Sequence, residues 1–158
     1  MEKEQESLTF IGRPFTDSLM NEQRSFAASN AEMENDQNWQ NFLKENNLAD
    51  CRSSLVVFGP DNFMYWYGVV AEMQVVPAGL MKYQLPQARV AQEELSNQSL
   101  TYFNEPLNLV LPPFLQKVAA TGTKVYENIG DSNTPYVLQT LNLATKKLTQ
   151  TLYLAVSH

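Results

Sequence analysis

The sequence predicts an α+β domain built from two β-α-β-β modules in tandem. Two helical patterns, at 36–47 and 107–122, alternate with apolar runs that show the two-residue period of β-strands. The strongest of these runs, 63–76, has an apolar or aromatic residue at every second position. Gly59, Pro60, Asp61 and Asn62 separate it from the run 54–58 and predict a hairpin.

Length and composition favour one domain with its own hydrophobic core. The chain has 158 residues, of which 44% are hydrophobic, and a domain of this size buries roughly 70% of its unfolded-chain surface. We therefore expect a single domain over 1–158, with a first half at about 8–76 and a second half at about 80–156.

Charge and cysteine content exclude several classes of function. The formal net charge of −6 disfavours direct nucleic acid binding, which needs a basic face to neutralise phosphates. Cys51 is the only cysteine, so the fold does not depend on an intramolecular disulfide. The start MEKEQES has no apolar signal core, and the stretch 54–76 is interrupted by Gly59, Pro60 and Glu72. We expect a cytoplasmic protein without a membrane-spanning helix.

In the first half, 8–15 indicates a short strand and 16–35 a loop with weak helix. Asp36 is the expected N-cap of a helix that buries Trp39, Phe42 and Leu43 and stops near Asn46. The hairpin 54–76 follows. One face of its second arm is entirely apolar or aromatic, being formed by Phe63, Tyr65, Tyr67, Val69, Ala71, Met73 and Val75.

In the second half, Pro77-Ala78-Gly79 predicts a turn, and 80–94 an extended segment with Pro86 at a bulge or edge. The apolar stripe 107–118 is helical, but Pro112 and Pro113 predict a kink or two short helices, and Gly122 a C-terminal cap. We expect a short strand at 123–128, a loop at 130–135 and a final strand at 147–156.

Common catalytic constellations find no support in these residues. The only histidine, His158, is the last residue, so a Ser-His-Asp or Cys-His arrangement would depend on a frayed terminus. One cysteine and one histidine provide no metal-binding spacing, and glycine patterns for phosphates or dinucleotides are absent. No metal and no cofactor are expected.

Several stretches carry a resemblance to a known family. The run 63–69 (FMYWYGV) has a tyrosine three residues before a glycine, and 77–80 (PAGL) is followed by Leu85-Pro86. The run 125–128 (VYEN), followed by 152–156 (LYLAV), matches a pair of C-terminal strands of which the first bears a glutamate. With Trp39 and Phe42 in the first helix, these stretches resemble the GyrI-like family. This family is also found as the effector-binding domain of many AraC-type and MerR-type transcription regulators.

The resemblance implies a specific architecture and site. Two halves related by pseudo-twofold symmetry would form one antiparallel sheet, and a cleft between the two helices, floored by the sheet, would hold the ligand. Glu127 would face a small organic cation, with aromatic neighbours adding cation–π attraction. The residues expected to bind the ligand are Glu127, Tyr65, Tyr67, Trp39, Phe114 and Tyr83. The chain departs from the family pattern at 92–99, at the prolines of the second helix and after Asn128.

Each of these residues also has a structural interpretation. Glu127 could be a solvated carboxylate at a strand edge, and without the resemblance that interpretation would be preferred. Tyr65 and Tyr67 share a strand face that could simply be core, as could Trp39 and Phe114 on their helices.

Three hypotheses about function remain open. The preferred one is a stand-alone module that senses or sequesters a small ligand, expected to be cationic and aromatic. The second is a hydrolase of reactive cyclopropane-type compounds, with Glu127 orienting water beside Tyr65. The third is an inhibitor that acts on gyrase or another protein partner. Catalysis is the less favoured outcome.

Overall fold

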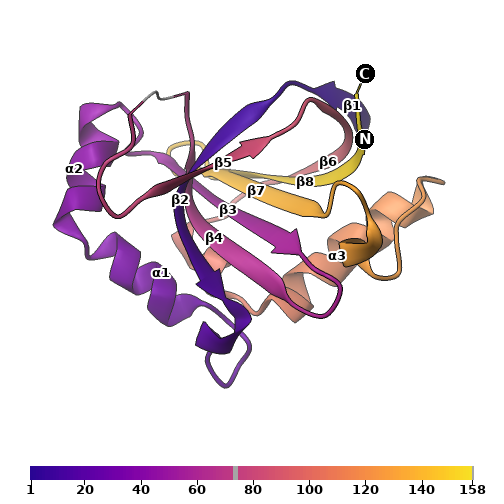
Figure 1. Cartoon of the computed structure of the whole chain (residues 1–158), viewed down its shortest axis with the longest axis horizontal. Coiled ribbons are helices and arrows are strands. Elements are labelled where there is room, and N and C mark those ends of the chain that lie inside the picture. Colours follow the sequence, from indigo (N-terminus) through magenta and orange to yellow (C-terminus); the bar gives the residue numbers. More distant parts are fainter. Residues whose placement is uncertain (73–74, 158) are drawn as a thin grey trace.

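The computed structural model describes residues 1–72 and 75–157. Within these ranges the chain forms one curled sheet, with its helices placed beside it (Figure 1). The strands are β1 (Glu2–Gln5), β2 (Leu8–Thr16), β3 (Cys51–Phe58), β4 (Phe63–Val70), β5 (Met81–Leu85), β6 (Ala88–Leu95), β7 (Tyr136–Asn142) and β8 (Lys147–Val156). The α-helices are α1 (Ala27–Glu34), α2 (Gln37–Glu45) and α3 (Leu107–Ala120), and the 3-10 turns are η1 (Asp17–Leu19), η2 (Leu100–Asn104) and η3 (Ile129–Asp131).

The sheet has eight strands in the order β1-β6-β8-β7-β3-β4-β2-β5, and every neighbouring pair is antiparallel. This order is symmetric about its centre: each strand of one half has a counterpart at the same distance from the opposite end of the sheet. The counterparts are β2 and β6, β3 and β7, β4 and β8, and β5 and β1. The predicted α+β fold with two β-α-β-β modules is therefore confirmed. β1 of the first module pairs with β6 of the second, and β5 of the second pairs with β2 of the first.

Local signals explain where several elements begin and end. The Asp36 carboxylate accepts a hydrogen bond from the Trp39 backbone N–H at 3.1 Å, so Asp36 is the N-cap of α2 as predicted. Gly59 N–H donates to the Asn62 carbonyl in the expected β3–β4 turn. Gly122 has φ +89° just beyond α3, the left-handed conformation that ends a helix.

The helix α3 differs from the prediction, because one helix runs through both Pro112 and Pro113. The two prolines remove the N–H groups that would bond to the carbonyls of Asn108 and Leu109. All four residues are exposed, so water can solvate those carbonyls, while the opposite face of the helix packs through Leu111, Phe114 and Val118. Packing on that face holds the helix together despite the lost bonds.

Several sequence-based boundaries were wrong. Residues 123–128 form no strand; the strand beside β3 in the second half is β7, which the sequence analysis missed. The segment 80–94 is split into β5 and β6 around Pro86, since the two strands pair with different neighbours. The stretch 16–35, predicted as a loop with weak helix, contains the regular helix α1. The strand 63–76 ends at Val70; Met73 and Gln74, like His158, lie outside the described residues.

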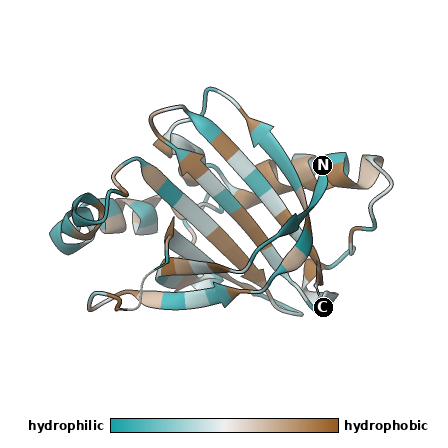
Figure 2. Cartoon of the chain, turned by 90° about the horizontal axis from the view of Figure 1, so that it is seen from above, coloured by the Kyte–Doolittle hydropathy of each residue, from teal (hydrophilic) through white to brown (hydrophobic). Residues whose placement is uncertain are grey.

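The two faces of the sheet carry separate cores. On one face, Tyr65, Tyr67 and Val69 pack under α1 and α2, and Val137 and Leu152 pack under α3. On the other face the sheet curls over its own core, formed by Phe10, Leu55, Trp66, Leu85, Ala88, Val90, Leu138 and Tyr153. The helices therefore share one face of the sheet, and the strands alternate hydrophilic and hydrophobic positions along their length (Figure 2).

No helix in the described part of the chain is long and apolar enough to cross a membrane.

Candidate functional site

The resemblance implies a ligand cleft between the two helices, floored by the sheet, but in the structure a chain segment packs on the sheet beside α1. The turn η2 connects β6 to α3 and packs against α1 and the sheet. The Tyr102 hydroxyl donates to Gln139 Oε1 at 2.7 Å and accepts from Gln150 Nε2 at 3.0 Å. Phe103 packs edge-to-face on Tyr67, with ring centroids 5.7 Å apart. The polar side chains Gln139 of β7 and Gln150 of β8 are thus hydrogen-bonded within the protein.

The aromatic residues predicted on β4 are also engaged inside the protein. The Tyr65 hydroxyl donates to Asn30 Oδ1 at 2.8 Å, and Asn30 Nδ2 donates to the Phe103 carbonyl at 2.9 Å. The ring of Phe26 stacks on Tyr65 at a centroid distance of 4.2 Å. Burial is the main reason that the pKa of Tyr65 is raised. Tyr65 therefore ties α1 and η2 to the sheet.

A buried ion pair lies at the end of α1. Glu34 binds the Arg52 guanidinium through both carboxylate oxygens, at 2.8 and 3.0 Å, and it accepts from the Tyr67 hydroxyl at 2.9 Å. The Trp39 indole N–H contacts the same carboxylate at 3.4 Å. Burial alone would raise the pKa of Glu34, but hydrogen bonding and charge from Arg52, with smaller contributions from Tyr67 and Trp39, outweigh it and hold that pKa below its usual value.

An apolar pocket of about 330 Å³ lies beside α3, where this helix meets the β3–β4 hairpin. Its apolar wall is formed by Val56, Phe58, Phe63, Leu107, Leu111, Pro112, Leu115 and Ile129, and the polar residues at it are Asn108, Glu127 and Asn128. Among the described residues that line the pocket, Glu127 is the only one that carries a charge. An apolar concavity of this size with few polar groups is typical of sites for small organic molecules.

Contacts with the β3–β4 turn and within the loop position the segment that carries Glu127. The Asn128 side chain accepts from Gly130 N–H at 3.1 Å and donates to the Pro60 carbonyl at 3.0 Å. Gly130 lies directly against the backbone of Gly59, so close that a Cβ atom would overlap the Gly59 carbonyl. The hairpin turn therefore fixes the loop at the edge of the pocket, with Glu127 exposed to solvent.

The structure places only one of the six predicted site residues at this pocket. Glu127 lines it, but from a loop and not from the predicted strand. Trp39 and Tyr67 meet at Glu34, and Phe114 is buried under α3. Tyr83 lies on the opposite sheet face, between Trp66 and Tyr136. The ring pair Phe58 and Phe63, with centroids 6.1 Å apart, lines the pocket instead.

Most of the pocket residues could not be predicted from the sequence, because they come from three separate segments. The predicted helical stripe 107–118 did contain Leu107, Leu111 and Leu115. Nothing local in the sequence pairs this stripe with the hairpin turn.

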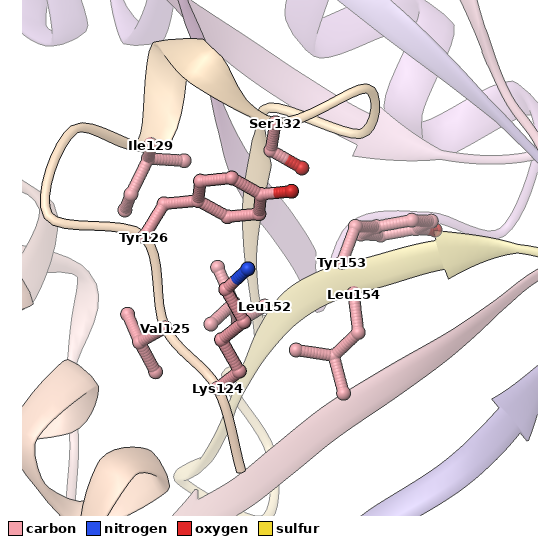
Figure 3. A pocket seen from close by; sticks show the side chains of 8 residues that line it. All are labelled: Lys124, Val125, Tyr126, Ile129, Ser132, Leu152, Tyr153 and Leu154. Carbon is pink, nitrogen blue, oxygen red and sulfur yellow. The ribbon is translucent and has the colours of Figure 1, made fainter.

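A second cavity lies next to Tyr126, between the loop and β8 (Figure 3). Its volume is about 20 Å³, which suits a single water and is too small for an organic molecule. Lys124 Nζ lies 5.0 Å from the centroid of the Tyr126 ring. The described residues contain no cluster of three or more His, Cys, Asp or Glu side chains that could hold a metal ion.

Comparisons with known proteins identify similar folds. No protein-family model and no curated protein matches the sequence. SAV2435, solved bound to tetraphenylphosphonium, is similar in structure, with a TM-score of 0.55 and 12% identity over 99% of this chain and 93% of that one. A candidate transcription regulation protein of Staphylococcus aureus MU50 has a TM-score of 0.51 and 12% identity, over 99% and 97% of the two chains. At this identity the likeness establishes a shared fold.

Proposed function

We propose that this chain is a GyrI-like module that binds a small organic cation with aromatic groups in the pocket beside α3. The observation that carries the proposal is the combination of an apolar wall and one carboxylate, Glu127, in a pocket of about 330 Å³. Binding would make the protein a sensor of the ligand or a store that sequesters it.

The chemistry of the pocket favours a cation whose charge is spread over an apolar body. Such a cation loses little hydration when it enters, whereas a compact ammonium ion would have to give up strong hydrogen bonds to water. The rings of Phe58 and Phe63 can attract the cation by about 0.5–2 kcal/mol each, depending on how dry the site becomes. Glu127 then selects a positive charge over a neutral molecule of the same shape.

The fold shared with SAV2435 supports the proposal, because that protein was solved with tetraphenylphosphonium, a cation of this kind. The resemblance of the sequence to GyrI-like proteins points in the same direction. The hydrolase hypothesis receives less support, since it requires Tyr65 beside Glu127. The Tyr65 hydroxyl donates to Asn30, and Tyr65 does not line the pocket.

Thermal unfolding with paired ligands tests the proposal. Tetraphenylphosphonium should raise the unfolding temperature by an amount that grows with the logarithm of its concentration above the dissociation constant, whereas neutral triphenylphosphine oxide should raise it less. In Glu127→Gln the advantage of the cation should fall roughly tenfold in dissociation constant, because the attraction of one charge at the solvent edge is lost.

The matched control is Glu45→Gln, which removes the same charge from the exposed end of α2. This variant should keep the preference for the cation. An equal loss in both variants would mean that only the net charge of the protein attracts the ligand, and the proposed site would be wrong.

A further inference from the structure

Another concavity, distinct from the two described above, has a volume of about 350 Å³. It opens where β3 and β8 begin and β4 and β7 end. The residues that line it are Cys51, Arg52, Ser53, Val70, Thr140, Leu141, Asn142, Thr145, Lys147 and Thr149. Most of them point away from the helices, because they alternate with Val56, Tyr67, Val137 and Leu152 along their strands. This concavity therefore opens on the sheet face opposite the pocket beside α3.

Three hydroxyl groups lie side by side across the central strands. Ser53 is paired with Thr140, and Thr140 with Thr149. The next residues inward on this face, Leu55 and Leu138, belong to the apolar core. Within the described chain the hydroxyls of Ser53, Thr140 and Thr149 have no hydrogen-bond partner, although Ser53 is only 3% exposed. None of the three hydroxyls is a fully buried unpaired atom, so water in the concavity can solvate them, and a ligand that replaces this water can hydrogen-bond to them.

Asn142 and Lys147 add donors to this concavity. Asn142 Oδ1 accepts the backbone N–H groups of Ala144 and Thr145, at 2.9 and 3.1 Å, which fixes the side chain and leaves its NH₂ group to donate. Lys147 brings a positive charge. Its contact with Glu94 is 3.6 Å long, and both side chains are more than half exposed, so this ion pair is weak.

The described lining contains no carboxylate, and Arg52 is occupied elsewhere. Its guanidinium donates to Glu34 and to the carbonyls of Ala49 and Cys51. The lining thus offers the hydroxyls of Ser53, Thr140, Thr145 and Thr149, one amide and one ammonium. Hydroxyls can donate or accept, whereas the amide NH₂ group and the ammonium only donate, so a negatively charged ligand rich in acceptors fits this lining.

We propose that this concavity, defined by Ser53, Thr140, Asn142, Lys147 and Thr149, is a binding site for a small anion that carries a phosphate or carboxylate group. The hydroxyls and the Asn142 amide would donate to the anionic oxygens, and Lys147 would supply the opposite charge. The site is independent of the proposed cation pocket, because it lies on the other face of the sheet and shares no lining residue with it.

Titration calorimetry of the full chain with ribose 5-phosphate, citrate and inorganic phosphate tests the proposal. At least one of these should bind with one site per chain. Lys147→Gln should weaken binding roughly tenfold or more, as expected for the loss of a hydrogen bond to a charged group. Thr140→Val keeps the shape of the side chain and removes one donor, so it should weaken binding less. Lys44→Gln, on the exposed side of α2, should have no effect.

Cys51 provides a local readout, because it is the only cysteine and lines the concavity. The bound anion should slow alkylation of Cys51 by iodoacetamide, and tetraphenylphosphonium should not. The proposal is overturned if none of the three anions binds, or if Lys147→Gln and Lys44→Gln bind equally well. Preference for ribose 5-phosphate or for citrate over inorganic phosphate would identify which anionic group the site accepts.

Discussion

Glu34, which was not among the residues predicted for the site, joins four elements of the fold. Its carboxylate joins the end of α1 to Arg52 of β3, to Tyr67 of β4 and to Trp39 of α2. The side chains of Arg52 and Glu34 are 6% and 19% exposed. Removing one partner leaves the other charge buried, which typically costs about 3–5 kcal/mol.

We expect Glu34→Gln to lower the free energy of unfolding at neutral pH by about 3 kcal/mol. Because the folded pKa of Glu34 lies below the ordinary value of 4.5, its ionised form stabilises the fold above pH 4.5. This contribution is lost as the pH falls from there through the lower folded pKa. Urea unfolding at a series of pH values should show a smaller loss of stability on acidification in Glu34→Gln than in the wild type. Parallel pH profiles would contradict this account.

Gly130 is a positioning residue for Glu127. A side chain at 130 would overlap the Gly59 carbonyl, so Gly130→Ala must push the loop away from the hairpin turn. We expect weaker binding of tetraphenylphosphonium with the carboxylate still present. Gly122→Ala, which meets no neighbouring atoms, is the comparison: it should cost stability because of its positive φ but leave affinity intact. Equal affinities in the two variants would argue that the loop does not form the site.

Among the elements, those with strong local signals could be predicted from the sequence. The Asp36 cap, the 59–62 turn and the alternation from Phe63 to Val69 each depend on neighbouring residues, and the structure confirms all three. The first strand of the C-terminal pair was misplaced, because VYEN at 125–128 and YVLQTLN at 136–142 are similarly rich in strand-forming residues. Pairing with β3 decides between them, and that contact is not local. Glu127 was proposed as a site residue through a motif, but its position on a loop could not be predicted from the sequence.

Helix α3 makes a separate prediction about stability. An interior proline costs about 3 kcal/mol relative to alanine, of which about 1 kcal/mol is recovered because proline also restricts the unfolded chain. Pro113 is exposed and does not line the pocket. Pro113→Ala should therefore raise the free energy of unfolding by about 1–2 kcal/mol, measured by urea denaturation, without changing affinity. A loss of stability would show that α3 needs the proline for its packing.

At the scale of the whole molecule, the two modules are linked by exchanged edge strands. β1 pairs with β6 of the other module, and β5 pairs with β2. Each half alone would lose a strand partner. It would also expose to water its part of the core on the curled sheet face, to which both halves contribute residues. We propose that the chain is one domain and expect a single cooperative unfolding transition. Fragments 1–76 and 77–158 should each lack stable structure by circular dichroism, whereas a folded fragment would indicate independent domains.

The location of the bound cation tests the central claim most directly. Methyl NMR spectra of the full chain, recorded during titration with tetraphenylphosphonium, report on both sheet faces in one measurement. We expect the methyl signals of Val56, Leu111, Leu115 and Ile129 to shift most, because these residues line the pocket beside α3. The signals of Leu55 and Leu138, in the core of the opposite face, should move little. The largest shifts on that opposite face, or no saturable shift at all, would contradict the proposed binding of the cation beside α3.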